Sequence, residues 1–287
     1  MLVIVGMLGV VGAVMGGYLM EHGKLALLFQ PAEFVIIFGA AMCSMLIATP
    51  ASTLKKLIAQ IVGVLKPGLL KADYADLLAL LYQLFRTAQQ SGIMALESHF
   101  EHPEQSSVLS KYPKFLARHE SLAFLSDSIK VIIVGGMAPH DLEALMDEDI
   151  YVHHSEARAP SVALAKVADA FPGLGIVAAV LGVVITMQAI DGPPSEIGEK
   201  VGAALVGTFL GIFMSYCVVG PIATKIKTVR EKKNRLYIIV KQTLLAYMNG
   251  SLPQVAIEFG RKTISAHDRP SIDAVEQSTL NAGSKAA

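Results

Sequence analysis

Two long apolar runs constrain the fold of this chain more than any other feature. Residues 170–190 and 201–224 contain no Asp, Glu, Lys, Arg or His, and a connector of ten residues, 191–200, joins them. Each run reaches the roughly 20 residues that a helix needs to cross the core of a bilayer. The pair therefore predicts two transmembrane helices in tandem.

Composition places the whole chain among membrane proteins. Of its 287 residues, 53% are hydrophobic and only 17% are charged, whereas soluble domains carry about 25% charged residues. Residues 1–20 and 34–50 form two further apolar runs. The predicted fold is all-α, with four transmembrane helices and a mainly helical cytoplasmic domain between spans two and three.

Basic residues orient these spans. The connectors 21–33 and 191–200 carry one Lys each, whereas residues 51–169 and 225–287 carry eleven Lys and Arg each. Basic segments remain on the cytoplasmic side of a membrane, so both termini are predicted to be cytoplasmic and both short connectors to face outward. The predicted divisions are spans one and two (1–50), a cytoplasmic domain (51–169), spans three and four (170–224) and a cytoplasmic tail (225–287).

The fourth apolar run carries small residues at helical spacing. Ala203, Gly207 and Gly211 recur every fourth residue and share one helix face, as close helix packing in lipid requires. Two hydroxyls, Thr186 in the third run and Thr208 in the fourth, could line an ion path. Ordinary hydrogen bonding between helices is the alternative role for these two threonines.

None of the four runs contains an ionisable side chain. Ion pathways normally require such a group facing a cavity, so the carboxylate of any ion path must come from a partner protein. The string at 260–263 resembles the end of a phosphate-binding loop, but Arg261 occupies the required glycine position. We find no nucleophile elbow or zinc-protease helix either, and predict neither an enzyme nor a bound cofactor or metal.

The segment 51–169 is predicted to be mainly helical. Its clearest helix spans residues 73–101, where Arg86 and Glu97 would project from one face about 16 Å apart along the axis. This face is either a charged docking surface or an ordinary solvated helix face. Residues 131–134 have a strand-like composition, and the last twenty or so residues are predicted to be disordered.

Six strings along the chain carry a family resemblance. They are QPAE at 30–33, DLLALLY at 76–82, EALMDE at 143–148, GIVAAV at 175–180, VGTFLG at 206–211 and EFGRKT at 258–263. On these strings the chain resembles the MotA family of flagellar motor stator proteins, over residues 1 to about 270. The related ExbB and TolQ energisers of outer-membrane transport remain the alternative, although they typically have three spans.

The resemblance implies an assembly in the bacterial inner membrane. The family pattern implies a homo-oligomer of five A subunits around two MotB-like subunits. Each MotB-like subunit would have one span and a peptidoglycan-binding domain, and would supply the aspartate that binds the coupling ion. The implied ion is the proton, with sodium less favoured, and the implied rotor partner is the switch protein FliG.

The resemblance also assigns roles to particular residues. Pro172 and Pro221 fall on the two family prolines that couple ion flow to cytoplasmic motion, and Thr208 falls on the position that faces the partner's aspartate. The family's rotor-contact glutamate falls on Glu97. Its rotor-contact arginine falls on Gln89, which departs from the pattern, and Arg86 lies one turn earlier and could replace it.

Overall fold

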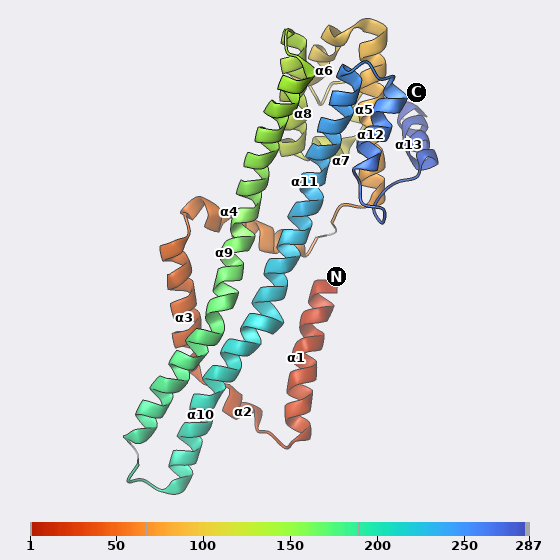
Figure 1. Ribbon diagram of the computed structural model, residues 1–287. Coiled ribbons are helices and arrows are strands. Elements are labelled where there is room, and N and C mark those ends of the chain that lie inside the picture. The colour runs from red at the N-terminus through yellow and green to blue at the C-terminus, as the bar shows by residue number, and fades with distance from the viewer. Residues whose placement is uncertain (1, 67, 189, 285–287) are drawn as a thin grey trace. The chain divides into compact units, whose positions relative to one another are not determined.

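The computed structural model describes residues 2–66, 68–188 and 190–284 of the chain, and these residues contain helices and turns but no strand. They form two compact units (Figure 1). Unit 1 comprises Met1–Pro67 and Glu156–Val229, and unit 2 comprises Gly68–Ser155 and Arg230–Ala287. Two long helices, α9 (Pro139–Met187) and α11 (Gly220–Met248), contribute residues to both units.

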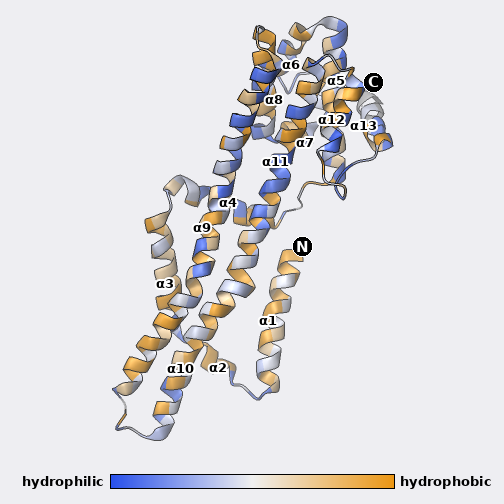
Figure 2. Ribbon diagram, in the orientation of Figure 1, coloured by the Kyte–Doolittle hydropathy of each residue, from blue (hydrophilic) through white to orange (hydrophobic). Residues whose placement is uncertain are grey.

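Unit 1 contains the apolar helices. Its other elements are α1 (Leu2–Met20), α2 (Leu25–Leu28), α3 (Pro31–Ala48), α4 (Ala51–Val64), α10 (Pro194–Phe213) and a π-helical turn, η3 (Met214–Val219). Among the described residues, four segments are long and apolar enough to cross a membrane, and they are Leu2–Met20, Leu25–Ala48, Pro139–Met187 and Pro194–Met248. Figure 2 shows α1, α3 and α10 mainly in the orange and white of apolar residues. The predicted four-span, all-α fold is confirmed.

The second span begins earlier than its apolar composition suggests. Pro31 occupies the first position of α3, where its missing N–H costs nothing and its fixed φ suits a helix. Helix α3 therefore includes Glu33, which is a residue of the predicted connector 21–33. The prediction that the spans lack ionisable side chains is wrong at this residue.

Apolar side chains from distant parts of the sequence form the core of unit 1. One cluster joins α3 to α9 and α10 through Ile37, Phe171, Ala178 and Leu210. Phe38 of α3 also meets Phe171 edge-on, with ring centroids 5.4 Å apart. These contacts hold the second span against the tandem pair of helices.

Unit 2 is built around α5 (Lys71–Ser91), whose leucines at 77, 78, 80, 81 and 84 are fully buried. The surrounding elements are η1 (Ile93–Leu96), α6 (Glu97–Glu101), η2 (Leu109–Lys111), α7 (Pro113–Leu116), α8 (His119–Val134), α12 (Pro253–Lys262) and α13 (Ile272–Ser284), with the adjoining parts of α9 and α11. The predicted cytoplasmic domain and tail thus share one core, rather than forming separate parts of the chain.

Three local predictions in this region are wrong. The expected helix over 73–101 is interrupted at Gly92, whose φ of +84° lies in a region that side-chain-bearing residues rarely adopt. Residues 131–134 complete helix α8 instead of forming a strand. Residues Ile272–Ser284 of the segment predicted to be disordered form α13, which packs on α5, with the hydroxyl of Ser278 3.4 Å from Asp76 Oδ1, whereas residues 285–287 lie outside the described part of the chain.

Charged contacts fasten the elements of unit 2. Arg118 donates to Asp73 Oδ1 at 2.9 Å, and the N–H of Leu70 donates to Asp73 Oδ2 at 2.8 Å. Burial alone would raise the pKa of Asp73, but these two donors outweigh burial and the pKa is lowered. The carboxylate therefore remains ionised. Through Arg118, which lies between α7 and α8, it holds these two helices against the start of α5.

Candidate functional site: the α9–α10 helix pair and the π-helical turn

Glycines allow α9 and α10 to touch backbone to backbone (Figure 1). A Cβ atom on Gly175 would lie 2.8 Å from the carbonyl oxygen of Gly207, and one on Gly211 would lie 2.5 Å from that of Phe171. Neither position can accept a side chain without displacing the neighbouring backbone. Gly207 and Gly211 of the predicted small-residue stripe therefore face α9 directly.

The third member of that stripe lies differently. Ala203 is half-buried, whereas its neighbour Ala204 is buried and approaches α9. A Cβ atom on Gly182 would lie 2.6 Å from the Cβ atom of Ala204. The residues of α10 that contact α9 closely are Ala204, Gly207 and Gly211. Because an α-helix has 3.6 residues per turn, a strict four-residue repeat drifts away from one face of the helix.

The two predicted pathway threonines differ in their surroundings. Thr186 is fully buried, and its hydroxyl donates to the carbonyl oxygen of Gly182 at 2.8 Å. Thr208 is half-buried, and its Cα lies 3.3 Å from the position that a Cβ atom on Gly175 would occupy. Both residues belong to the α9–α10 pair, but the hydroxyl proton of Thr186 is already used within its own helix.

An acidic residue of α3, Glu33, reaches this helix pair. Its side chain is buried, with 6% of its surface exposed. A Cβ atom on Gly207 would lie 2.5 Å from Glu33 Oε2, and one on Gly182 would lie 3.7 Å from Glu33 Oε1. The carboxyl group of α3 thus occupies space that the two glycines leave open between α9 and α10.

Pro172 lies inside a helix rather than at its end. Helix α9 continues through Pro172 for 49 residues in all, with Pro160 as a second internal proline. Proline cannot donate the backbone hydrogen bond that would normally reach the carbonyl four residues earlier, here that of Ala168. This leaves a weak point in α9, as the family resemblance implied for a coupling residue.

The second predicted coupling proline, Pro221, follows a change in helix type. Residues Met214–Val219 form the π-helical turn η3, and the N–H of Gly220 donates to the carbonyl oxygen of Ser215, five residues earlier. Pro221 comes directly after this turn, near the start of α11. The wider turn accommodates a proline that lacks its own N–H, and such turns occur frequently at functional sites.

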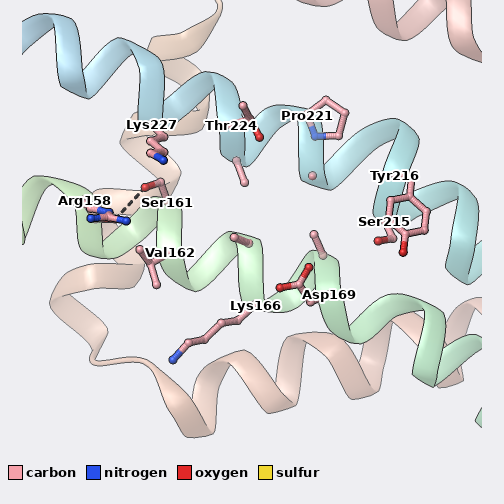
Figure 3. Close-up of a pocket in the computed structure, with 14 residues that line it drawn as sticks. Arg158, Ser161, Val162, Lys166, Asp169, Ser215, Tyr216, Pro221, Thr224 and Lys227 are labelled. Carbon is pink, nitrogen blue, oxygen red and sulfur yellow. Dashed lines mark hydrogen bonds between the residues drawn. The ribbon is translucent and has the colours of Figure 1, made fainter.

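A pocket of about 500 Å³ lies between residues 158–169 of α9 and the segment that contains the π-helical turn and Pro221 (Figure 3). The figure shows Ser215, Tyr216 and Pro221 on one side, and Lys166 and Asp169 of α9 on the other. Ala168, whose carbonyl loses its usual donor to Pro172, also lines the pocket. Pro221 therefore lines a hollow in unit 1 together with polar and charged side chains, whereas Pro172 lies outside its lining.

The predicted rotor-contact residues lie on the surface of unit 2. Arg86 and Gln89 are exposed on α5, and Glu97 is exposed at the first position of α6. Because the chain turns at Gly92, Arg86 and Glu97 do not share one helix axis, and their predicted spacing along a single helix is wrong. All three side chains nevertheless remain accessible in this unit.

Sequence reasoning missed Glu33 and the π-helical turn. The apolar run begins at Phe34, which places Glu33 in the predicted connector. Pro31, however, is a residue typical of the first helical position and indicates that the helix begins earlier. The π-helical turn has no comparable signal, because its sequence, MSYCVV, is as apolar as the helix around it.

Comparisons with known proteins agree with this architecture. A model described as motility protein A N-terminal matches residues 4–92, and one for the MotA/TolQ/ExbB proton channel family matches residues 116–237. The fold is thus that of a four-span membrane protein, and it is similar over residues 116–237 to the MotA/TolQ/ExbB proton channel family.

Full-length relatives narrow the assignment. Motility protein A of Escherichia coli is 42% identical over 278 residues, covering 96% of this chain and 94% of the relative. The chemotaxis protein LafT of Vibrio parahaemolyticus is 40% identical, covering 95% and 96%. The chain belongs to the motility protein A family.

Two solved structures share the fold. The structure of C. jejuni MotAB gives a TM-score of 0.77 at 19% identity, covering 94% of this chain and 98% of that one. The flagellar MotAB stator complex from Bacillus subtilis gives 0.72 at 21%, covering 93% and 96%. The ExbB and TolQ alternative is not favoured, because the full-length similarity is to motility proteins.

Proposed function

We propose that this protein is the A subunit of a bacterial flagellar motor stator. With a MotB-like subunit it forms an ion channel that couples ion flow to rotor torque. The observation that carries this proposal is the 42% identity to motility protein A of Escherichia coli over 96% of the chain. An enzymatic activity forms no part of the proposed role.

The proposed location is the inner membrane, with both termini and unit 2 in the cytoplasm. The supporting observation is the distribution of Lys and Arg, which are concentrated in residues 51–169 and 225–287. In this orientation the loop between α1 and α3 and the loop between α9 and α10 face outward. The proposed assembly contains five A subunits and two MotB-like subunits that bind peptidoglycan.

In the proposed mechanism, the partner's aspartate carries the proton past the α9–α10 pair. Thr208 and Thr186 supply hydroxyl oxygens along that path. The weak points at Pro172 and Pro221 allow the two helices to bend when the proton binds or leaves, since each proline removes one backbone hydrogen bond. Arg86 and Glu97, with Gln89 between them, contact the rotor switch protein FliG.

Purification from the native membrane in mild detergent, followed by mass spectrometry, tests the proposal. We expect a single-span protein with an intramembrane aspartate and a peptidoglycan-binding domain to remain bound. A small partner without that domain would instead indicate a transport energiser. Absence of any partner, together with failure of the gene to restore swimming to a strain lacking its A subunit, would overturn the stator role.

The coupling ion requires its own experiment. Swimming speed should change with external pH and remain constant when sodium is replaced by potassium at fixed pH. A speed that follows sodium concentration would replace the proton with sodium in the proposal. The stator assignment itself would remain, because the partner subunit is identified separately.

A further inference from the structure

Glu33 stands out among the polar side chains of the described part of unit 1. It is buried in the second span, and no donor within the described residues forms a hydrogen bond with its Oε2 atom. An ionised carboxylate is costly in such a place, because its burial removes the charge from water. Ionisable groups inside a membrane protein usually mark an ion or proton path.

A purely structural role does not account for this geometry. Glu33 is the third residue of α3, where a glutamate often accepts the backbone N–H of the N-cap residue. Here the oxygen Oε2 points instead toward Gly207 of α10, and Gln30 at the N-cap makes no side-chain capping bond. The side chain therefore turns away from its own helix end and into the contact between α9 and α10.

The surroundings of Glu33 match those of a proton site. Gly182 of α9 and Gly207 of α10 lie beside its two carboxyl oxygens, and neither residue is titratable. The hydroxyl of Thr186 is held one turn away on α9, bonded to the carbonyl oxygen of Gly182. A carboxyl group thus lies between two glycines of the helix pair, and Thr186 is bonded to the carbonyl oxygen of one of them.

We propose that Glu33 is a proton-accepting carboxyl group on the outer half of the ion path, ahead of the partner's aspartate. A proton from the external water forms an O–H bond at Oε2, and this bond breaks when the proton moves on to the next carboxylate. The inference rests on the proposed stator function and orientation, in which the start of α3 faces outward. It adds a protonation site within the A subunit itself.

The matched variants are Glu33→Gln, which keeps shape and hydrogen bonding but does not titrate, and Glu33→Asp, which retains a carboxyl group. Glu199→Gln removes an exposed carboxyl group from α10 and serves as the control. Each variant is co-expressed with the native partner and purified as the complex. Proton uptake is then measured in vesicles with an imposed membrane potential and an internal pH dye.

We expect Glu33→Gln to retain the partner and to lower proton uptake by at least about tenfold, as for loss of a proton-transfer group. Glu33→Asp should restore part of the uptake, and Glu199→Gln should match the wild type. Unchanged uptake by Glu33→Gln would overturn this inference while leaving the stator role intact. Failure of the wild-type complex to conduct any ion would count against the proposed function itself.

A measurement on the wild-type complex covers the case in which the Glu33 variants do not assemble. A hydrophobic carbodiimide reacts with protonated carboxyl groups in apolar surroundings. We expect it to modify Glu33 and to leave the exposed Glu199 unmodified, with the sites identified by peptide mass spectrometry. Absence of modification at Glu33 across the pH range in which the complex conducts would also overturn the inference.

Discussion

At the scale of single residues, buried charges in unit 2 are satisfied in pairs and triads. Lys241 is 7% exposed, and its Nζ atom lies 2.8 Å from Asp147 Oδ1 and 3.3 Å from Glu143 Oε1. The two carboxylates are much more exposed than the lysine. The lysine is therefore the buried member of this triad, and the loss in free energy of unfolding should depend on which member is removed.

Lys241→Met should change the free energy of unfolding by no more than about 1 kcal/mol, because the exposed carboxylates regain water and the apolar stem is kept. The double variant Glu143→Ala with Asp147→Ala should lose about 3–5 kcal/mol, because it leaves a buried ammonium unpaired. Thermal unfolding of the purified protein in detergent measures both. Equal losses in the two variants would contradict this asymmetry.

Gly207→Ala tests the contact between Glu33 and α10. The added Cβ atom would lie 2.5 Å from Glu33 Oε2 and 3.1 Å from the Cβ atom of Ala178, so we expect a loss of about 1–3 kcal/mol from overpacking. Adding Glu33→Ala should recover part of the loss as a coupling energy. The control is Gly202→Ala, where nothing lies within 4 Å of the new atom, and strictly additive effects would disprove the contact.

At the scale of helices, the sequence predicted which helices form better than it predicted where they begin and end. Long uncharged runs predicted the four spans correctly, since helix length in a membrane is limited by bilayer thickness. The start of α3 and the break at Gly92 were missed, because each depends on one residue whose backbone angles the surrounding pattern does not reveal. The small-residue repeat predicted a close helix contact, but not that Glu33 would fill part of it.

Pro172 provides the prediction that belongs to this scale. Pro172→Ala restores a backbone hydrogen bond inside α9 and favours the helix by up to about 3 kcal/mol, so the complex should assemble normally. Swimming should nevertheless slow or stop, because the helix loses its weak point. Pro160→Ala alters the same helix elsewhere and serves as the control; normal speed for Pro172→Ala at equal expression would exclude a coupling role.

At the scale of the whole molecule, the chain builds each unit from segments that are far apart in sequence. Unit 2 combines residues that precede the third span with residues that follow the fourth. Ion pairs connect several of these segments, such as the pairs of Asp73 with Arg118 and of Asp268 with Lys232. Sequence alone could not reveal these pairings, because they join positions with no local pattern in common.

These ion pairs predict how unit 2 responds to acid. The pKa of Asp268 is lowered by the hydrogen bond from Lys232 and then by the one from His267, and the pKa of Asp73 is also lowered. A carboxyl group with a lowered pKa in the folded state stabilises fully above its unfolded pKa of about 4, and this contribution is lost as pH falls through the folded pKa. Unit 2 should therefore lose stability in strong acid.

Asp73→Asn isolates one of these contributions. At pH 7 the variant should be about 1.5–3 kcal/mol less stable, as for loss of a charged hydrogen bond, and the difference should shrink as pH falls below about 4. Thermal unfolding of both proteins in detergent over this pH range provides the comparison. A difference that stays constant with pH would show that the carboxylate charge is not responsible.

The string EFGRKT shows how a sequence can imitate a binding motif. A Cβ atom on Gly260 would collide with the methyl group of Thr243, so α12 presses directly on α11. Arg261 donates through two nitrogens to the carboxylate of Glu258 and through a third to the carbonyl oxygen of Pro270. The hydroxyl of Thr263 donates to the carbonyl oxygen of Gly260. The residues of this string therefore fix the docking of one helix on another, although their letters end like those of a nucleotide loop.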